Sequence, residues 1–138
     1  MRSTKEKRVY IEAVASLVGY KLAYYNPGDF GRYRLTRSGD FHDRYKYSTL
    51  SLADMYTYAV GMLAGYTSVS AEAEAEGYAF VNAYISCRSS GNSEAVATIA
   101  AEVQRSIAKA EAEASRSRSA QQIEEALQQS VAKHTSEA

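Results

Sequence analysis

The sequence predicts an α+β protein, with an N-terminal helix, a three-stranded antiparallel sheet and a second helix, followed by a helical C-terminal region. Apolar residues recur at helical spacing near the N-terminus and again after residue 50. Tyrosine-rich segments between these stretches alternate as strands do, and turn residues separate them. We expect residues 1–68 to form the α+β unit, and residues 69–138 to pack on it or to mediate self-association.

The first helix is expected over residues 4–18. Thr4 is a possible N-cap, and Gly19 is a plausible residue to end the helix in the left-handed conformation. One face of the helix is apolar, because four aliphatic residues fall at spacings of three, three and one: Ile11, Val14, Leu17 and Val18.

Three short strands are expected next. Residues 20–25 alternate and are rich in tyrosine, which favours a strand. The sequence Asn-Pro-Gly-Asp at 26–29 is a strong turn, because proline presets φ and glycine tolerates positive φ. Residues 30–37 form the return strand, a second turn follows at 38–40, and residues 41–47 form the third strand.

Cations gather on one face of the second and third expected strands, and tyrosines are interleaved with them. A face with aromatic side chains is the expected inner one, so the cations would face outward. This surface is the expected site of partner binding. Its residues are Arg32, Arg34, Arg37, Arg44, Lys46, Tyr33 and Tyr45.

Two helices are expected between residues 51 and 88. Ser51 with Asp54 resembles a capping box, and the apolar stripe that follows runs to Tyr66. Gly61 and Gly65 are expected to let a neighbouring backbone approach, with Gly65 also near the helix end. Ser70 caps a further helix over residues 71–88.

The C-terminal region is expected to be a long helix from Ser93. It has one narrow apolar seam, formed by Val96, Ile99, Val103, Ile107, Ala110 and Ala114. Residues 116–119 (RSRS) are a weak point, so one helix and two helices both remain open. Such a narrow seam on a polar helix needs a partner. The partner is either the N-terminal unit or a second copy of the chain, which makes a homodimer through these helices a possibility.

The charge is divided between the two halves of the chain. Residues 1–47 contain ten Lys/Arg and five Asp/Glu, whereas residues 48–138 contain six and eleven, so the net charge of zero hides +5 and −5. The two halves attract each other, or one of them binds a charged partner. The single cysteine excludes an intramolecular disulfide, and we expect a reduced, cytoplasmic setting. The polar N-terminus and the short apolar run at 52–66 predict neither a signal peptide nor a membrane span.

Recognised catalytic and metal-binding motifs are absent from the sequence, so we expect no cofactor, no metal and no enzymatic activity. His42 lies near Asp40 and Asp43, but such neighbours are common by chance. Cys87 is expected to be a buried, inert thiol. The glutamates at 72, 74 and 76 point in different directions on a helix, and the helix dipole explains them better than a site does.

Non-catalytic binding is the expected function. Tyrosine and arginine are enriched in protein–protein hot spots, which favours a protein partner. The size and character of the chain suggest a small accessory or inhibitor protein, of the kind that bacteriophages and other mobile genetic elements encode. The alternative is nucleic-acid binding through the same basic face, since arginines contact phosphates and tyrosines stack on bases. The neutral net charge counts against the alternative.

Overall fold

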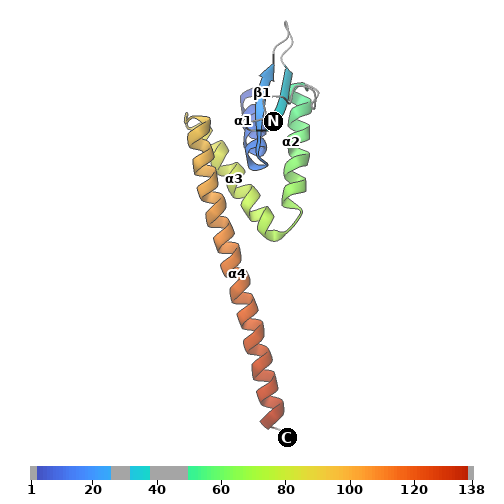
Figure 1. The fold of residues 1–138 in the computed structure, drawn as a ribbon, viewed down its shortest axis with the longest axis vertical. Helices are drawn as coiled ribbons and strands as arrows, with labels where there is room; N and C mark the ends of the chain where they lie inside the picture. The colour runs from blue at the N-terminus through green and yellow to red at the C-terminus, as the bar shows by residue number, and fades with distance from the viewer. Residues whose placement is uncertain (1–2, 26–31, 38–49, 137–138) are drawn as a thin grey trace.

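The computed structural model describes residues 3–25, 32–37 and 50–136, and it confirms a mixed, mostly helical fold with a small antiparallel sheet. Figure 1 shows a compact head with one long helix running down from it. The elements of the described residues are α1 (Thr4–Leu17), β1 (Tyr20–Tyr25), β2 (Arg32–Arg37), α2 (Leu52–Thr67), α3 (Ala71–Ser89) and α4 (Glu94–Ser136). We call α1, β1, β2, α2 and α3 together the head.

Helix α1 lies at the centre of the head, with Ile11 and Val14 fully buried. Its N-cap is Ser3 rather than the expected Thr4, because the Ser3 side chain accepts a hydrogen bond from the Glu6 amide. Gly19 follows the helix with φ of +83°, which confirms its role in ending the helix.

The sheet has two strands among the described residues, not the three expected. β1 pairs with β2 in antiparallel register, from Tyr20 opposite Arg37 to Tyr25 opposite Arg32. Among the described residues, the other edge of β2 forms one isolated bridge, in which Tyr33 and Leu50 exchange two backbone hydrogen bonds of 2.8 and 2.7 Å. The turns expected at 26–29 and 38–40 and the strand expected at 41–47 lie wholly outside the described residues.

The caps of α2 and α3 are as expected. The side chains of Ser51 and Ser70 accept hydrogen bonds from the third amide after each of them. The expectation for the α2 glycines was wrong: both Gly61 and Gly65 lie inside the helix, and a Cβ added at either would meet no described residue of a neighbouring element within 4 Å. The close approach occurs instead at Gly77 of α3, where an added Cβ would lie 3.0 Å from the Tyr66 ring.

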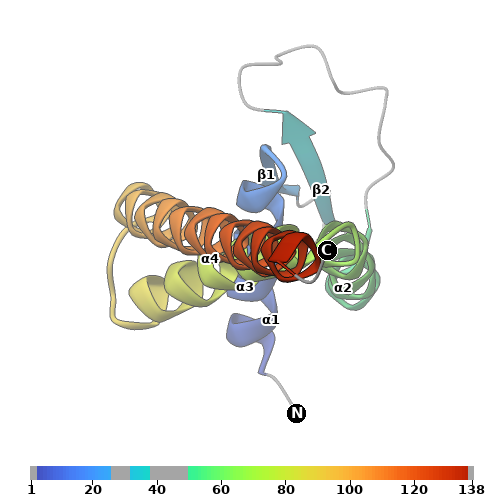
Figure 2. The ribbon, with the colours of Figure 1, turned by 90° about the horizontal axis from the view of Figure 1, so that it is seen from below.

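Helix α4 is one continuous helix of 43 residues, so residues 116–119 do not interrupt it. Figure 2 shows its first half lying alongside α3, with α1 crossing behind the pair. The residues of α4 that are buried in the core are two alanines, Ala97 and Ala101, in the same cluster as Phe80 and Tyr84 of α3. Every residue from Glu113 to Thr135 is exposed. None of the described helices has the length and apolar character required to cross a bilayer.

Candidate functional site

The expected binding residues on the sheet are only partly described. Arg44, Tyr45 and Lys46 lie outside the described residues, and Arg32 and Arg37 are placed by their backbone, at the two ends of β2. That these cations form one surface therefore stays a prediction.

Tyr33 and Arg34 lie on opposite faces of β2, as the alternation of a strand requires. The Tyr33 ring is in the core, with only 4% of the residue exposed, whereas Arg34 is half-buried. Arg8 of α1 donates a hydrogen bond to the Tyr33 hydroxyl at 2.9 Å, and its guanidinium carbon lies 5.8 Å from the ring centroid. A partner could not reach this ring without opening the packing between α1 and the sheet.

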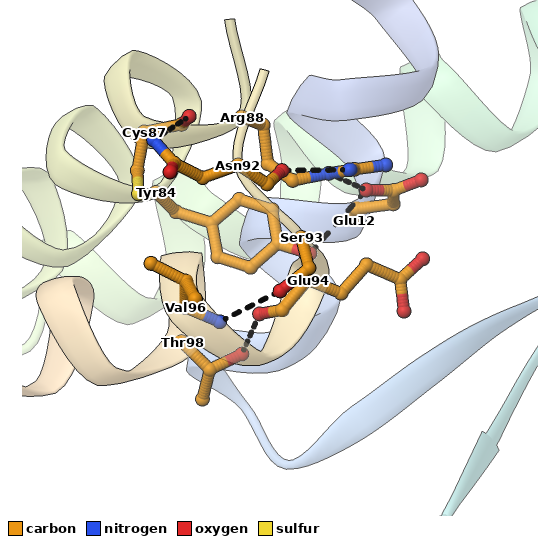
Figure 3. Close-up of polar contacts among 9 residues, drawn as sticks. All are labelled: Glu12, Tyr84, Cys87, Arg88, Asn92, Ser93, Glu94, Val96 and Thr98. Atoms are coloured by element: carbon orange, nitrogen blue, oxygen red, sulfur yellow. Dashed lines mark hydrogen bonds and ion pairs between the residues drawn. The ribbon is translucent and has the colours of Figure 1, made fainter. Parts of the chain in front are cut away.

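A polar cluster that the sequence did not indicate joins α1 to α3 (Figure 3). Oε2 of Glu12 accepts hydrogen bonds from the Tyr84 hydroxyl and from Nε of Arg88, both at 3.3 Å. The Glu12 side chain is only 12% exposed, so the Arg88 guanidinium compensates a nearly buried charge. Arg88 also donates to the Asn92 carbonyl at 3.1 Å, which extends the cluster to the turn between α3 and α4.

Burial raises the pKa of the Tyr84 hydroxyl well above its usual value, and the nearby carboxylates of Glu12 and Glu94 raise it further. The hydroxyl therefore stays protonated and acts as a hydrogen-bond donor to Glu12. An open cleft of about 400 Å³ adjoins the cluster, with Lys21 and Thr98 also in its lining. Among the described residues, no three His, Cys, Asp or Glu side chains are grouped so that they could hold a metal ion. The hydrogen bonds of the cluster connect α1 to α3 and to the turn that precedes α4.

Two arginines of α4 form polar contacts with the head. Arg105 donates a hydrogen bond to the Tyr66 hydroxyl at 2.9 Å, and its guanidinium carbon lies 6.0 Å from the centroids of both the Tyr66 and Phe80 rings. Farther along, Arg116 forms an ion pair with Glu72 at 2.5 Å. These contacts fix the direction of α4, so the exposed surface of its first half is a preformed one.

Four large aliphatic side chains of α4 lie in solvent on the side facing away from α3. We call them the proximal stripe: Val96, Ile99, Val103 and Ile107, which are between 44% and 66% exposed. At 100° per residue, the stripe is centred about 135° around the helix from Ala97 and Ala101, which are buried in the core. The head therefore does not cover the apolar seam of this helix, and one of its two expected partners is excluded.

A second exposed set lies near the C-terminus. We call Ile123, Leu127 and Val131 the distal stripe; they are 62–66% exposed. The helical repeat places the distal stripe about 120° around α4 from the proximal stripe. Because α4 is one continuous helix, a single straight partner helix cannot cover both stripes.

No protein-family model matches this chain, and neither the curated proteins nor the solved structures include a match to it.

Proposed function

We propose that the protein is a non-catalytic binding module, in which the head holds α4 rigidly and the proximal stripe docks an amphipathic helix of a protein partner. The observation that carries the proposal is the exposure of Val96, Ile99, Val103 and Ile107 on one face of a helix whose opposite face is already packed. Single exposed aliphatic residues are ordinary, but four in one stripe at helical spacing form a contiguous apolar surface.

The size of the stripe indicates a moderate affinity. Fully burying such a side chain contributes about 1.5–3 kcal/mol, and roughly half of each remains exposed here. Together with a matching stripe on the partner, the gain is roughly 6–12 kcal/mol, comparable with the association cost of about 4–15 kcal/mol. At the lowest association cost the surplus is at most about 8 kcal/mol, so the tightest dissociation constant that the stripe supports is on the order of micromolar.

Matched variants of the full chain test the proposal. Val103→Glu places a charge in the proximal stripe, and Leu127→Glu makes the same kind of change at a similarly exposed site on the same helix. Proteins bound from a lysate of the native host should be retained by wild type and by Leu127→Glu, and lost with Val103→Glu. Equal retention by all three would contradict the proposal.

The outward face of β2 supports a second candidate, binding of a protein or a nucleic acid through its arginines. The supporting observation is that Arg34 lies on the face opposite Tyr33 and Leu35, which are buried. If nucleic acid is the ligand, Arg34→Ala should weaken binding and reduce the dependence of affinity on salt. A binding affinity that does not change with salt would exclude this candidate.

The biological setting remains a prediction from the sequence. We propose a cytoplasmic accessory or inhibitor protein of a mobile genetic element, on the basis of its small size, its single cysteine and its tyrosine-rich N-terminal half.

A further inference from the structure

Three of the four residues of the proximal stripe belong to a set of positions that is symmetric about residue 105. Moving along the face of α4 that is turned away from α3, the positions are spaced 4, 3, 4, 3 and 4, which is the spacing of a two-helix seam. They are Val96, Ala100, Val103, Ile107, Ala110 and Ala114, with Ile99 at their flank. Reversing the helix about residue 105 exchanges position 96 with 114, 100 with 110, and 103 with 107.

We propose that the helix docked on the proximal stripe is α4 of a second copy of this chain, running antiparallel and centred on residue 105. This inference rests on the proposed function and names its partner. In such a pair Val103 of one copy packs on Ile107 of the other, at the middle of the contact. Toward each end, Ala100 meets Ala110 and Val96 meets Ala114, so the small alanines let the two helices approach closely.

The length of α4 favours the antiparallel direction. α4 begins at Glu94, and in a pair centred on residue 105 this residue lies opposite Arg116 of the second copy. The overlap therefore ends where the apolar seam ends. A parallel pair would instead keep the two helices together through residues 117–136, where the same spacing places Gln121, Glu124 and Gln128 in the seam. In a parallel pair Glu124 would face Glu124 of the other copy, and like charges in such positions repel.

The placement of the head is compatible with the antiparallel pair. The stripe faces away from α3, so the two heads lie on the outer sides of the pair. Beyond Arg116 each helix extends past the start of the other, and the distal stripe takes no part in the contact.

Whether the purified full chain forms dimers tests the proposal that the partner is a second copy of the chain. Light scattering and sedimentation equilibrium should show a monomer–dimer equilibrium for wild type and for Leu127→Glu. Val103→Glu should raise the dimer dissociation constant on the order of 100-fold, because the symmetric contact buries the introduced carboxylate twice. Circular dichroism should confirm that both variants keep the helical content of wild type.

Spin labels test the direction of the pair. In a Cys87→Ala background, labels attached at Ser119→Cys should lie about 42 Å apart along the axis of an antiparallel pair, against roughly 10–20 Å in a parallel one. A short distance at this site would overturn the antiparallel arrangement while leaving the stripe as the dimer contact. A wild type that stays monomeric at high micromolar concentration would overturn the inference altogether. The proposed function would then still hold if retention of a lysate protein depends on Val103.

Discussion

Arg88 of α3 donates a hydrogen bond through Nε to Oε2 of Glu12 in α1, at 3.3 Å and across 76 residues of sequence. The same carboxylate oxygen accepts from the Tyr84 hydroxyl. This contact joins α3, which packs against α4, to α1 at the centre of the head. The orientation of α4 therefore depends on it.

Arg88→Ala is expected to destabilise the fold by about 1–3 kcal/mol, because it leaves the nearly buried Glu12 carboxylate without its cation. Urea unfolding followed by circular dichroism measures the change. Arg118→Ala, at an exposed site on α4, is the control and should change the free energy of unfolding by less than about 0.5 kcal/mol. Equal effects from the two changes would show that the Glu12–Arg88 contact adds no stability.

Tyr84 should make the fold less stable in alkali. Burial, reinforced by Glu12, raises the pKa of its hydroxyl in the folded state above the ordinary tyrosine value of about 10. The unfolded chain then releases this proton at a lower pH than the folded chain, so stability falls as the pH rises above about 10. Tyr84→Phe removes this titration, and its free energy of unfolding should fall less steeply than that of wild type between about pH 9 and 11. Parallel curves for the two proteins would mean that the Tyr84 pKa is not raised.

Gly77→Ala should destabilise the protein by up to about 2 kcal/mol, although alanine is the better helix former. The new Cβ would lie 3.0 Å from the Tyr66 ring and 3.1 Å from Cγ2 of Thr67. Neither neighbour can shift easily, since Arg105 holds the Tyr66 hydroxyl and the Thr67 hydroxyl donates to the Leu63 carbonyl at 2.8 Å.

Gly61→Ala is the matched control for Gly77→Ala. Its Cβ would meet nothing within 4 Å, so the helix propensity of alanine should stabilise the protein by roughly 0.5–1 kcal/mol. Thermal unfolding of the two variants should therefore shift in opposite directions. A stabilising Gly77→Ala would mean that α2 and α3 are packed less closely at this point.

Helix boundaries could be predicted from the sequence because local chemistry determines them. Ser51 and Ser70 cap their helices through their own side chains, and Gly19 supplies a positive φ at the end of α1. The inner face of β2 was also predictable, because Tyr33 and Leu35 alternate with Arg34. The break in the helix that was considered at residues 116–119 does not occur. Serine and arginine are both tolerated in helices, and Arg116 gains an ion pair with Glu72.

Two features of the candidate site could not be predicted from the sequence. The aliphatic seam of α4 was the natural choice for a buried face, yet α3 packs on Ala97 and Ala101. Small residues on α4 leave room for the large Phe80 and Tyr84 rings, and this complementarity depends on the relative placement of two helices. The Glu12–Arg88 pair could likewise not be predicted from the spacing of neighbouring residues, because the two residues are distant in sequence.

Hydrogen exchange should differ along α4. The first half packs on the head through Ala97 and Ala101 and through the Arg105–Tyr66 hydrogen bond, whereas every residue from 117 to 135 is exposed. A helix segment without tertiary contacts is marginally stable in water, so amides of residues 120–135 should exchange much faster than those of residues 97–112. Equally slow exchange in both halves would show that a partner covers the distal stripe.

Docking through the proximal stripe can be tested by the molar mass of the purified chain in solution, measured by light scattering over a range of micromolar concentrations. Wild type and Leu127→Glu should approach twice the monomer mass as concentration rises, while Val103→Glu should keep the monomer mass. A dimer that persists in Val103→Glu, or one that Leu127→Glu abolishes instead, would contradict the claim that the proximal stripe of α4 is the docking surface.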